Sequence, residues 1–186
     1  MAERTDTADM ILERATAADV PIVVALMNRA FRGQGDVRGW NTEAPYIAGD
    51  RTSVALLEAD IAQKPDARLL VVRRADDGSP FASVWLEPLG DGLWYLGSLT
   101  IDPAIQNGGI GRTLLAASEG WVRTQGGDTV RMTVVNVRET LIAWYQRRGY
   151  RLTGDTEPFP YDDTRFGVPL RDDLHFVVLD KALDVG

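Results

Sequence analysis

Apolar residues recur three or four positions apart in four segments of the chain, a spacing that is typical of helices packed on one side. These segments cover residues 17–30, 51–63, 109–124 and 138–148. Thr16 followed by Asp19 predicts a capping box at the start of the first helix. Gly126 and Gly149 follow the third and fourth segments, where glycine commonly ends a helix.

Shorter apolar runs, some of them alternating with polar residues, predict strands. They cover residues 11–14, 67–74, 80–87, 93–101, 129–135, 150–153 and 174–179. The turn at 75–79 predicts a hairpin between the second and third strands. Polar segments rich in Gly or Pro lie at 32–50 and 154–173. The first is interpreted as a long loop or a broken helical segment, and the second as a loop. Hairpins combined with helical crossovers predict a mixed sheet covered by helices.

Length and composition indicate one globular domain. A chain of 186 residues with 45% apolar and 25% charged residues is suited to a single core. We therefore assign residues 10–186 to one domain and residues 1–9 to a flexible tail. No apolar run approaches the roughly 20 residues that span a bilayer, and the first residues lack the pattern of a secretory signal. We expect a cytoplasmic protein with no membrane partner.

Charge and residue types exclude several kinds of chemistry. The chain has no cysteine, which excludes disulfides and thiol catalysis, and a single histidine, His175, so we expect no metal site. The formal net charge of −7 argues against a nucleic-acid partner, because phosphate binding needs clustered basic residues. This acidity is compatible with a cationic substrate, or it serves solubility alone.

A glycine-rich loop lies between the strand at 93–101 and the helix that follows. It contains Gly108, Gly109, Gly111 and Arg112 within five residues. The first amides of a helix lack helical partners, and glycine lets a backbone approach a ligand closely. The loop is therefore suited to an anion such as phosphate, or it is only a structural turn. It matches neither the Walker pattern nor the dinucleotide pattern, whose last glycine is replaced by Leu114.

The spacing Gln106-x-x-Gly109-x-Gly111, after a strand that ends Leu99-x-Ile101-x-Pro103, resembles the acetyl-coenzyme A signature of the GNAT family of N-acetyltransferases. A second block, residues 136–154, resembles the family's strand-to-helix segment. Its matching residues are Asn136, Tyr145, Gly149 and Tyr150. The two blocks stand in the family's order, and the resemblance covers most of the chain from Ile11 to Leu179.

The resemblance implies a GNAT-like α/β fold, with a mixed, mostly antiparallel sheet of about six to seven strands flanked by about four helices. It implies direct transfer of the acetyl group of acetyl-CoA to a primary amine. The implied binding residues are Leu99, Thr100 and Ile101 beside the pantetheine arm; Gln106, Asn107, Gly108, Gly109, Ile110, Gly111, Arg112 and Thr113 around the pyrophosphate; and Asn136 and Tyr145. Gly97, inside the strand, indicates independently a bulge, a close backbone approach or a local packing requirement.

By the same resemblance, Tyr145 would be the general acid that protonates the leaving thiolate; alone, it would be interpreted as a core residue beside Trp144. The general base is harder to assign. Many family members carry a carboxylate in the strand before the loop, whereas this strand has none and carries Tyr95 near that place. Glu43, Glu87 and a water relay near Tyr95 are the alternatives.

Two loops are candidates for the acceptor side. Segment 39–51 could contribute an aromatic and charged pocket from Trp40, Glu43, Tyr46 and Arg51, or it is a plain surface loop. Segment 157–169 could overhang the acceptor with Phe159, Tyr161 and its acidic pair, or only cover the sheet edge. His175 is interpreted as an ordinary half-buried strand residue, with acid–base work as the alternative.

We expect a small-molecule amine as acceptor. The alternatives are acetylation of a protein N-terminus or lysine, and a catalytically silent CoA-binding module with a regulatory role. Dimers are common in the family, so the resemblance also makes a homodimer an expectation.

Overall fold

The computed structural model describes residues 10–33, 42–105 and 108–184. Four sequence expectations lie outside these ranges: the tail at 1–9, Trp40, and the coenzyme contacts of Gln106 and Asn107.

Seven strands form one sheet in the order β1-β3-β4-β5-β6-β9-β7. Their bounds are β1 Glu13–Arg14, β3 Arg68–Arg73, β4 Pro80–Gly90, β5 Leu93–Ile101, β6 Thr129–Val135, β7 Arg151–Pro158 and β9 His175–Ala182. Among the described strands of this sheet, only β5 and β6 pair in parallel, while every other neighbouring pair is antiparallel. The predicted mixed, mostly antiparallel sheet is confirmed, as is the hairpin of β3 and β4.

Four α-helices cover this sheet in the described part of the chain. They are α1 Val20–Arg32, preceded by a 3-10 turn at Ala17–Asp19, α2 Val54–Gln63, α3 Ile110–Thr124 and α4 Glu139–Gln146. The helices form a layer on each face of the sheet. Successive side chains of β3 point to opposite faces, so they pack in different layers. Leu69 and Val71 pack in the core cluster beneath α1 and α2, whereas Leu70 and Val72 pack in the cluster beneath α3 and α4.

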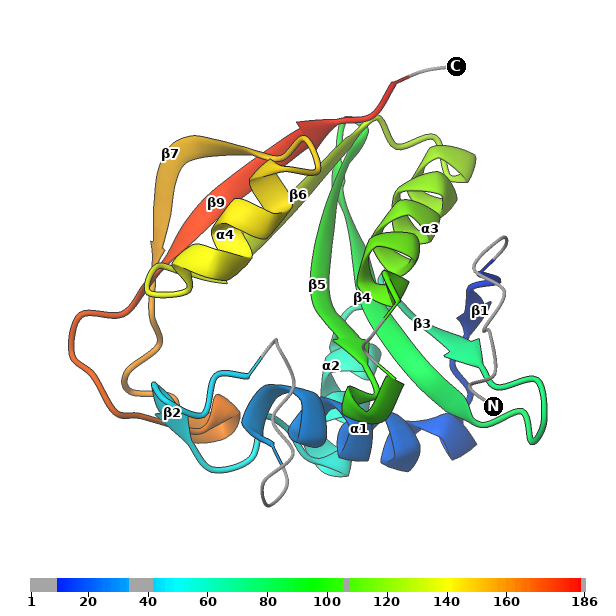
Figure 1. Ribbon diagram of the computed structural model, residues 1–186, viewed down its shortest axis with the longest axis horizontal. Coiled ribbons are helices and arrows are strands. Elements are labelled where there is room, and N and C mark those ends of the chain that lie inside the picture. Colours follow the sequence, from blue (N-terminus) through cyan, green and yellow to red (C-terminus); the bar gives the residue numbers. More distant parts are fainter. Residues whose placement is uncertain (1–9, 34–41, 106–107, 185–186) are drawn as a thin grey trace.

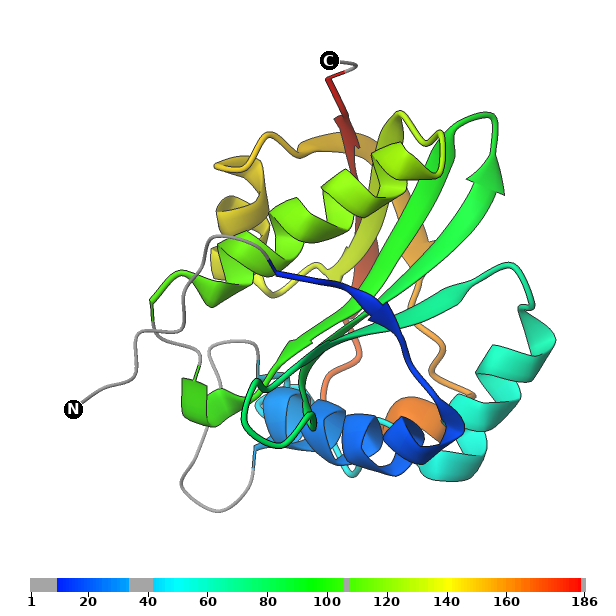
Figure 2. The same ribbon diagram turned by 90° about the vertical axis from the view of Figure 1, so that its right-hand side faces the viewer.

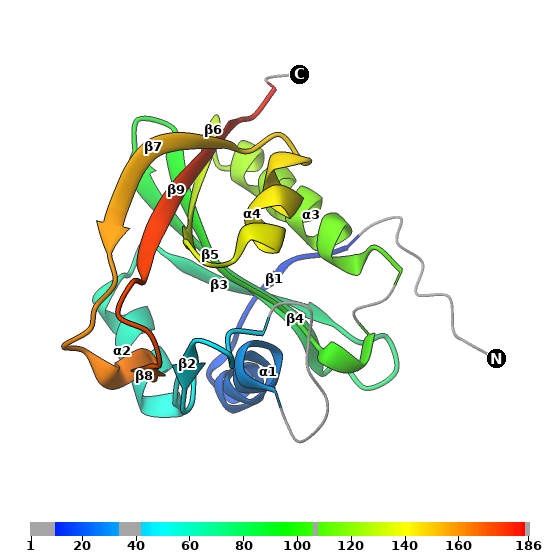
Figure 3. The same ribbon diagram turned by 60° about the vertical axis from the view of Figure 1, so that its left-hand side comes forward.

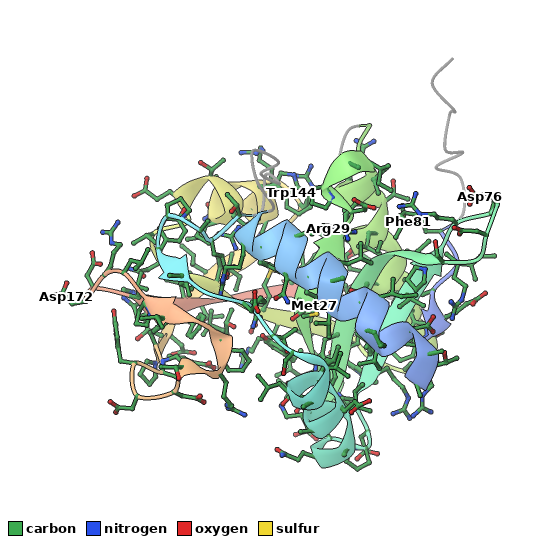
Figure 4. The ribbon with its side chains drawn as sticks, turned by 90° about the horizontal axis from the view of Figure 1, so that it is seen from below. Met27, Arg29, Asp76, Phe81, Trp144 and Asp172 are labelled. Atoms are coloured by element: carbon green, nitrogen blue, oxygen red, sulfur yellow. The ribbon has the colours of Figure 1, made fainter. Side chains whose placement is uncertain are left out.

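The figures show the same two layers. In Figure 2, α3 lies on one side of the central strands, with α1 and α2 on the other. Figure 4, seen from the side of α1, shows this helix crossing the molecule with Met27 and Arg29 labelled on it and α2 beside it. Among the described residues, no helix is long and apolar enough to cross a membrane.

The predicted loop at 154–173 is wrong in two places. Strand β7 continues to Pro158 through an irregularity between Leu152 and Thr156, and the 3-10 turn Thr164–Phe166 leads into β8 (Val168–Pro169). Strand β8 pairs with β2 (Ile47–Ala48), which lies inside the other predicted loop. The side chains of β7 are exposed throughout, and its continuation over residues 154–158 has no alternation of apolar residues that would have revealed it.

Strands β5 and β6 pair only at one end. Their register runs from Leu93–Thr129 to Tyr95–Arg131, and beyond this the two strands diverge (Figures 1 and 3). On its other edge β5 bulges against β4, because the register passes from Trp85–Gly97 to Ser83–Thr100, and Ser98 adopts a positive φ of 49°. A bulge bends its strand and redirects side chains. The sheet therefore opens beside the bulge.

The predicted capping box is present at the 3-10 turn that precedes α1, and it leads to a stability prediction. The buried Asp19 carboxylate accepts hydrogen bonds from the Thr16 N–H (2.7 Å) and hydroxyl (2.9 Å), and from two Arg73 nitrogens (2.8 and 2.9 Å). We expect Asp19→Asn to lower the free energy of unfolding at pH 7 by about 2–3 kcal/mol, because it breaks a buried ion pair. Urea denaturation of both proteins would measure the difference.

The pH dependence of this loss has a definite sign. The Arg73 guanidinium holds the pKa of Asp19 well below its usual range. A carboxylate with a lowered pKa in the folded state stabilises the fold above its unfolded pKa of about 3.9, and this stabilisation fades as the pH falls below it. The difference between wild type and Asp19→Asn should therefore shrink from pH 6 towards pH 3. Asp66→Asn, at an exposed carboxylate, is the control, and an undiminished difference at pH 3 would contradict the assignment.

Candidate active site

A cavity of about 330 Å³ lies where β5 and β6 separate. One part of its lining comes from the sheet, residues 95–99 of β5 and 132–135 of β6, and from Leu141 and Tyr145 of α4. The other part comes from the end of α1, the segment around β2 and the segment between β7 and β8. These last segments lie together below the opening in Figure 3. The site is thus a cleft with a strand on each side and an outer wall of irregular chain.

The glycine loop enters α3 with a left-handed backbone. Gly109 is the N-cap of α3 with φ 80°, and Gly108 before it has φ 93°. A Cβ added at Gly108 would meet nothing within 4 Å, so the chain around it is open. Arg112 is exposed in the first turn of the helix. The start of this 15-residue helix fits the phosphates of a nucleotide coenzyme. It offers the free amides of the first turn, the positive end of the helix dipole and an arginine.

The predicted coenzyme strand lies at the bulge. Leu99 lines the cavity, while Thr100 and Ile101 are buried in the sheet opposite Ser83 and Ala82 of β4. Gly97 has a packing reason: a Cβ there would lie 2.7 Å from Cε1 of the Tyr95 ring. The glycine therefore lets the Tyr95 ring lie across its own strand at the edge of the cavity.

Tyr145 lies in the last turn of α4 and reaches the cavity from the side opposite the outer wall. Its ring packs edge-to-face on Trp144 and Tyr150, with centroids 5.0 and 5.7 Å apart. Burial raises its pKa to about 12, so the hydroxyl stays protonated at neutral pH. Among the described residues the hydroxyl has no hydrogen-bond partner. A protonated hydroxyl at a cavity surface is able to donate a proton to a bound group.

Tyr95 is the second hydroxyl of the cavity. Its oxygen lies 3.4 Å from Oγ1 of Thr133 on β6, close to where the two strands part. Tyr95 and Tyr145 therefore reach the same space from β5 and α4, and the structure brings together two of the three predicted catalytic side chains at the bulge.

Glu43, the third predicted catalytic residue, lines the outer part of the cavity between two arginines. Its Oε2 lies 2.6 Å from Arg32 Nη1, and its Oε1 lies 3.4 Å from Arg138 Nη1. The side chains of these arginines are only 8% and 6% exposed. Arg32 also donates to the carbonyls of Gly49 (2.9 Å) and Phe166. Glu43 is therefore a buried counterion, and its ion pair with Arg32 connects segments of the outer wall.

The charge of this wall affects the arginines themselves. Burial lowers the pKa of Arg32, the Glu43 carboxylate opposes this, and the nearby Arg51 and Arg138 lower the pKa further. The wall thus concentrates positive charge in a chain of negative net charge. The described residues contain no group of three or more His, Cys, Asp or Glu side chains that could hold a metal ion.

Other candidates lie elsewhere. Asn136 joins β6 to β9, since its side chain accepts from the His175 N–H (3.0 Å) and donates to the Asp173 carbonyl (3.1 Å). Its contact with the coenzyme stays a prediction. Glu87 pairs with Lys64 Nζ at 2.8 Å. Neither Glu87 nor His175 is among the described residues that line the cavity.

The two candidate loops of the acceptor side both contribute to the cavity. Glu43 and Arg51 line it from the first, and Phe159 from the second. Tyr46 and Tyr161 do not appear among the described lining residues; the Tyr161 hydroxyl instead accepts a hydrogen bond from the Leu174 N–H at 2.7 Å.

Sequence reasoning missed several residues that line the cavity: Phe31, Arg32, Ser98, Arg138 and Phe166. Basic residues at the end of a helix, such as Arg32 on α1, are common on surfaces and give no sign of burial. Arg138 could have been found from the sequence, because it stands two residues after Asn136 in the second block that resembles the family.

Comparisons with known proteins agree with this geometry. Residues 27–150 match the family model described as the Acetyltransferase (GNAT) family. No curated protein matches the sequence at a significant level.

Three solved structures illustrate the likeness of fold. The ribosomal-protein-alanine N-acetyltransferase of Brucella melitensis is 19% identical, with a TM-score of 0.65 over 94% of this chain and 100% of that one. An N-acetyltransferase from Staphylococcus aureus Mu50 is 15% identical, with a TM-score of 0.65 over 95% and 100%. A GNAT family acetyltransferase from Elizabethkingia anophelis, whose structure has acetyl-CoA bound, is 18% identical, with a TM-score of 0.57 over 68% and 83%.

The matched range includes the end of α1, strands β3 to β6, the glycine loop with α3, and α4, and it ends at Tyr150. These elements include the strands and helices that form one part of the cavity lining, together with the glycine loop. The chain therefore belongs to the GNAT acetyltransferase family, whose members are acyl-CoA-dependent N-acetyltransferases.

Proposed function

We propose that this enzyme transfers the acetyl group of acetyl-CoA directly to the primary amine of a small molecule. The observation that carries this proposal is the cleft itself, where the hydroxyl groups of Tyr95 and Tyr145 border the bulged strand. A cavity of about 330 Å³ is of the size that holds a small ligand. Its outer wall, which spans α1, β2 and the segment before β8, favours a compact acceptor over a protein segment.

For the donor, we propose that the backbone amides from Gly108 to Arg112, at the start of α3, and the Arg112 guanidinium bind the pyrophosphate, with Thr113 beside them. Gln106 and Asn107 complete this set in the proposal. The pantetheine arm would then enter between the diverging strands beside Leu99, with Thr100, Ile101 and Asn136 framing its path. A backbone amide at the bulge would polarise the thioester carbonyl, because negative charge grows on that oxygen as the amine attacks.

We assign proton donation to Tyr145. Its raised pKa keeps the phenol protonated, which is the form needed to protonate a departing thiolate. Arg138 is one of the charges that act on Tyr145, and it lowers the pKa of the phenol against the effect of burial. A nearby cation therefore makes the phenolate that forms after donation less costly.

The acceptor amine must lose a proton before it attacks, because an alkylammonium group has a pKa near ~10.4. Nearby positive charge lowers the pKa of such an amine. Arg32, Arg51 and Arg138 supply that charge in this cleft. We propose that the amine passes its proton to water held by Tyr95. Both oxygens of Glu43 are engaged by guanidinium groups, so Glu43 suits holding the arginines better than acting as the base.

The proposal is tested by incubating the protein with acetyl-CoA and a panel of small amines, lysine-containing peptides and peptides with free N-termini, with thiol release as the readout. We expect release that depends on a small amine, and a product heavier by one acetyl group. Tight CoA binding without amine-dependent release from any acceptor would favour a silent CoA-binding module. A cytoplasmic location and a homodimer stay predictions from the sequence.

A further inference from the structure

Arg51 is an unusual arginine in this cleft. Its guanidinium carbon lies 5.3 Å from the ring centroid of Phe31 and 5.2 Å from that of Phe166. Its Nη2 lies 3.5 Å from Oγ of Ser98, the bulge residue. Its backbone N–H donates to Oδ1 of Asn28 at 2.8 Å, which fixes the start of the side chain. The aromatic rings and this anchor hold the guanidinium at the edge of the cavity.

Within the described ranges, Arg51 makes no ion pair. Arg32 and Arg138, its neighbours in the wall, share the Glu43 carboxylate. The described lining contains three arginines against two glutamates, and the second glutamate, Glu157, lies on the exposed strand β7. A half-buried guanidinium without a counterion is costly, so such a site is suited to an anionic ligand. The net charge of the whole chain, −7, therefore does not describe the acceptor pocket.

The position of Arg51 limits how far the anion lies from the reacting amine. In the proposed reaction, the amine attacks a thioester held beside the bulge of β5. Arg51 touches that bulge through Ser98. An acceptor that reaches both groups carries its anionic group only a few bonds from its amine. A guanidinium edge matches a carboxylate with two parallel hydrogen bonds.

Several other residues that line the cavity are aromatic. Phe159 and Phe176 stack with centroids 5.6 Å apart, and both line the cavity with Phe31 and Phe166. Such a surface is suited to an apolar group on the acceptor. We propose that the acceptor is an α-amino acid with an apolar side chain, whose carboxylate binds Arg51 while its amine is acetylated. This inference rests on the proposed acetyl transfer and names its substrate class.

The test compares amino acids with relatives that lack the carboxylate. L-Leucine, L-methionine and L-phenylalanine are each assayed with acetyl-CoA beside their primary amides and their decarboxylated amines. We expect kcat/KM for the amino acid to exceed that of both relatives by about 10-fold to 100-fold, the range for one charged hydrogen-bonded contact. Equal or better turnover of the relatives would overturn the inference.

Variants of Arg51 separate a carboxylate contact from a structural role. In Arg51→Gln, kcat/KM for the amino acid should fall by about 10-fold to 100-fold, and the ratio of acid to amide should approach one. Arg51→Lys keeps the charge without the planar fork and should recover part of the loss. Arg14→Gln, at an exposed arginine of β1, is the matched control. An equal loss on acids and amides in Arg51→Gln would overturn the inference.

A binding measurement distinguishes failure of this inference from failure of the proposed activity. Calorimetry follows L-phenylalanine binding to the wild-type protein saturated with CoA, and the same titration is repeated with Arg51→Gln. Binding that weakens by about 10-fold in the variant supports the carboxylate contact. Binding without acetylation of any amine would leave only the carboxylate contact with Arg51 standing, and would overturn both the proposed activity and the role of the amino acid as acceptor. If the protein acetylates other amines but does not bind amino acids, the proposed activity stands and this inference is overturned.

Discussion

Gly109→Asp is expected to weaken CoA binding on the order of 100-fold to 1000-fold. Gly109 caps α3 with φ 80°, at the point where the first helical amides are to meet the pyrophosphate. A carboxylate placed there faces the phosphates at short range, where repulsion between like charges amounts to several kcal/mol. Calorimetric titration with CoA measures the loss, which should become smaller at high salt because salt screens the repulsion.

A matched control lies at the other end of the same helix. Gly126 follows α3 with φ 82°, and a Cβ there would meet nothing within 4 Å. Gly126→Asp therefore imposes the same left-handed strain and the same new charge, but away from the cleft. It should leave the affinity for CoA close to that of the wild type. Unchanged affinity in Gly109→Asp would contradict the assignment of the loop to the pyrophosphate.

The elements that could be predicted are those whose own sequence shows the spacing of apolar and polar residues typical of a helix or a strand. Strand β5 (Leu93–Ile101) and helix α3 (Ile110–Thr124) match the predicted ranges because each buries one continuous apolar face. The start of strand β7 was predicted, but its continuation over residues 154–158 was missed because it lies at the sheet edge with exposed side chains, and its pairing depends on β9 rather than on its own apolar residues. Local pattern therefore predicted the covered elements and failed at the uncovered edge.

The residues of the candidate site divide in a similar way, into those that a local motif reveals and those that only the fold brings together. The position of Tyr145 at the cavity was predictable because it belongs to a short motif with fixed spacing. The role of the glycine loop in binding the coenzyme, which comes from a similar motif, stays a prediction. The arginine wall was not predictable, because its ion pairs join distant parts of the chain: Glu43 and Arg138 are 95 residues apart in the sequence. Nothing local to Arg51 shows that two aromatic rings enclose its guanidinium. The net charge was compatible with a cationic substrate or with a role in solubility alone, whereas the arginines that line the cleft suit the anionic group that we propose.

Tyr145→Phe is expected to lower kcat by about 100-fold or more while the affinity for CoA stays unchanged. The substitution removes the hydroxyl that we assign to proton donation and keeps the ring that packs on Trp144 and Tyr150. Single-turnover or steady-state rates at saturating substrates measure the first effect, and calorimetry the second. Tyr150→Phe is the control: its hydroxyl donates to Glu119 at 2.9 Å, away from the cavity, so this variant should lose stability but keep kcat.

The pH profile gives a second and independent test of Tyr145. Because burial raises its pKa to about 12, the proton-donating form persists as the pH rises and is lost only near that value. The acceptor amine, in contrast, becomes more nucleophilic as it loses its proton. The kcat/KM of the wild type should therefore rise with pH and show no descending limb up to about pH 10. A descending limb below pH 10 that disappears in Tyr145→Phe would contradict the raised pKa, and equal kcat in the two proteins would exclude Tyr145 as the acid.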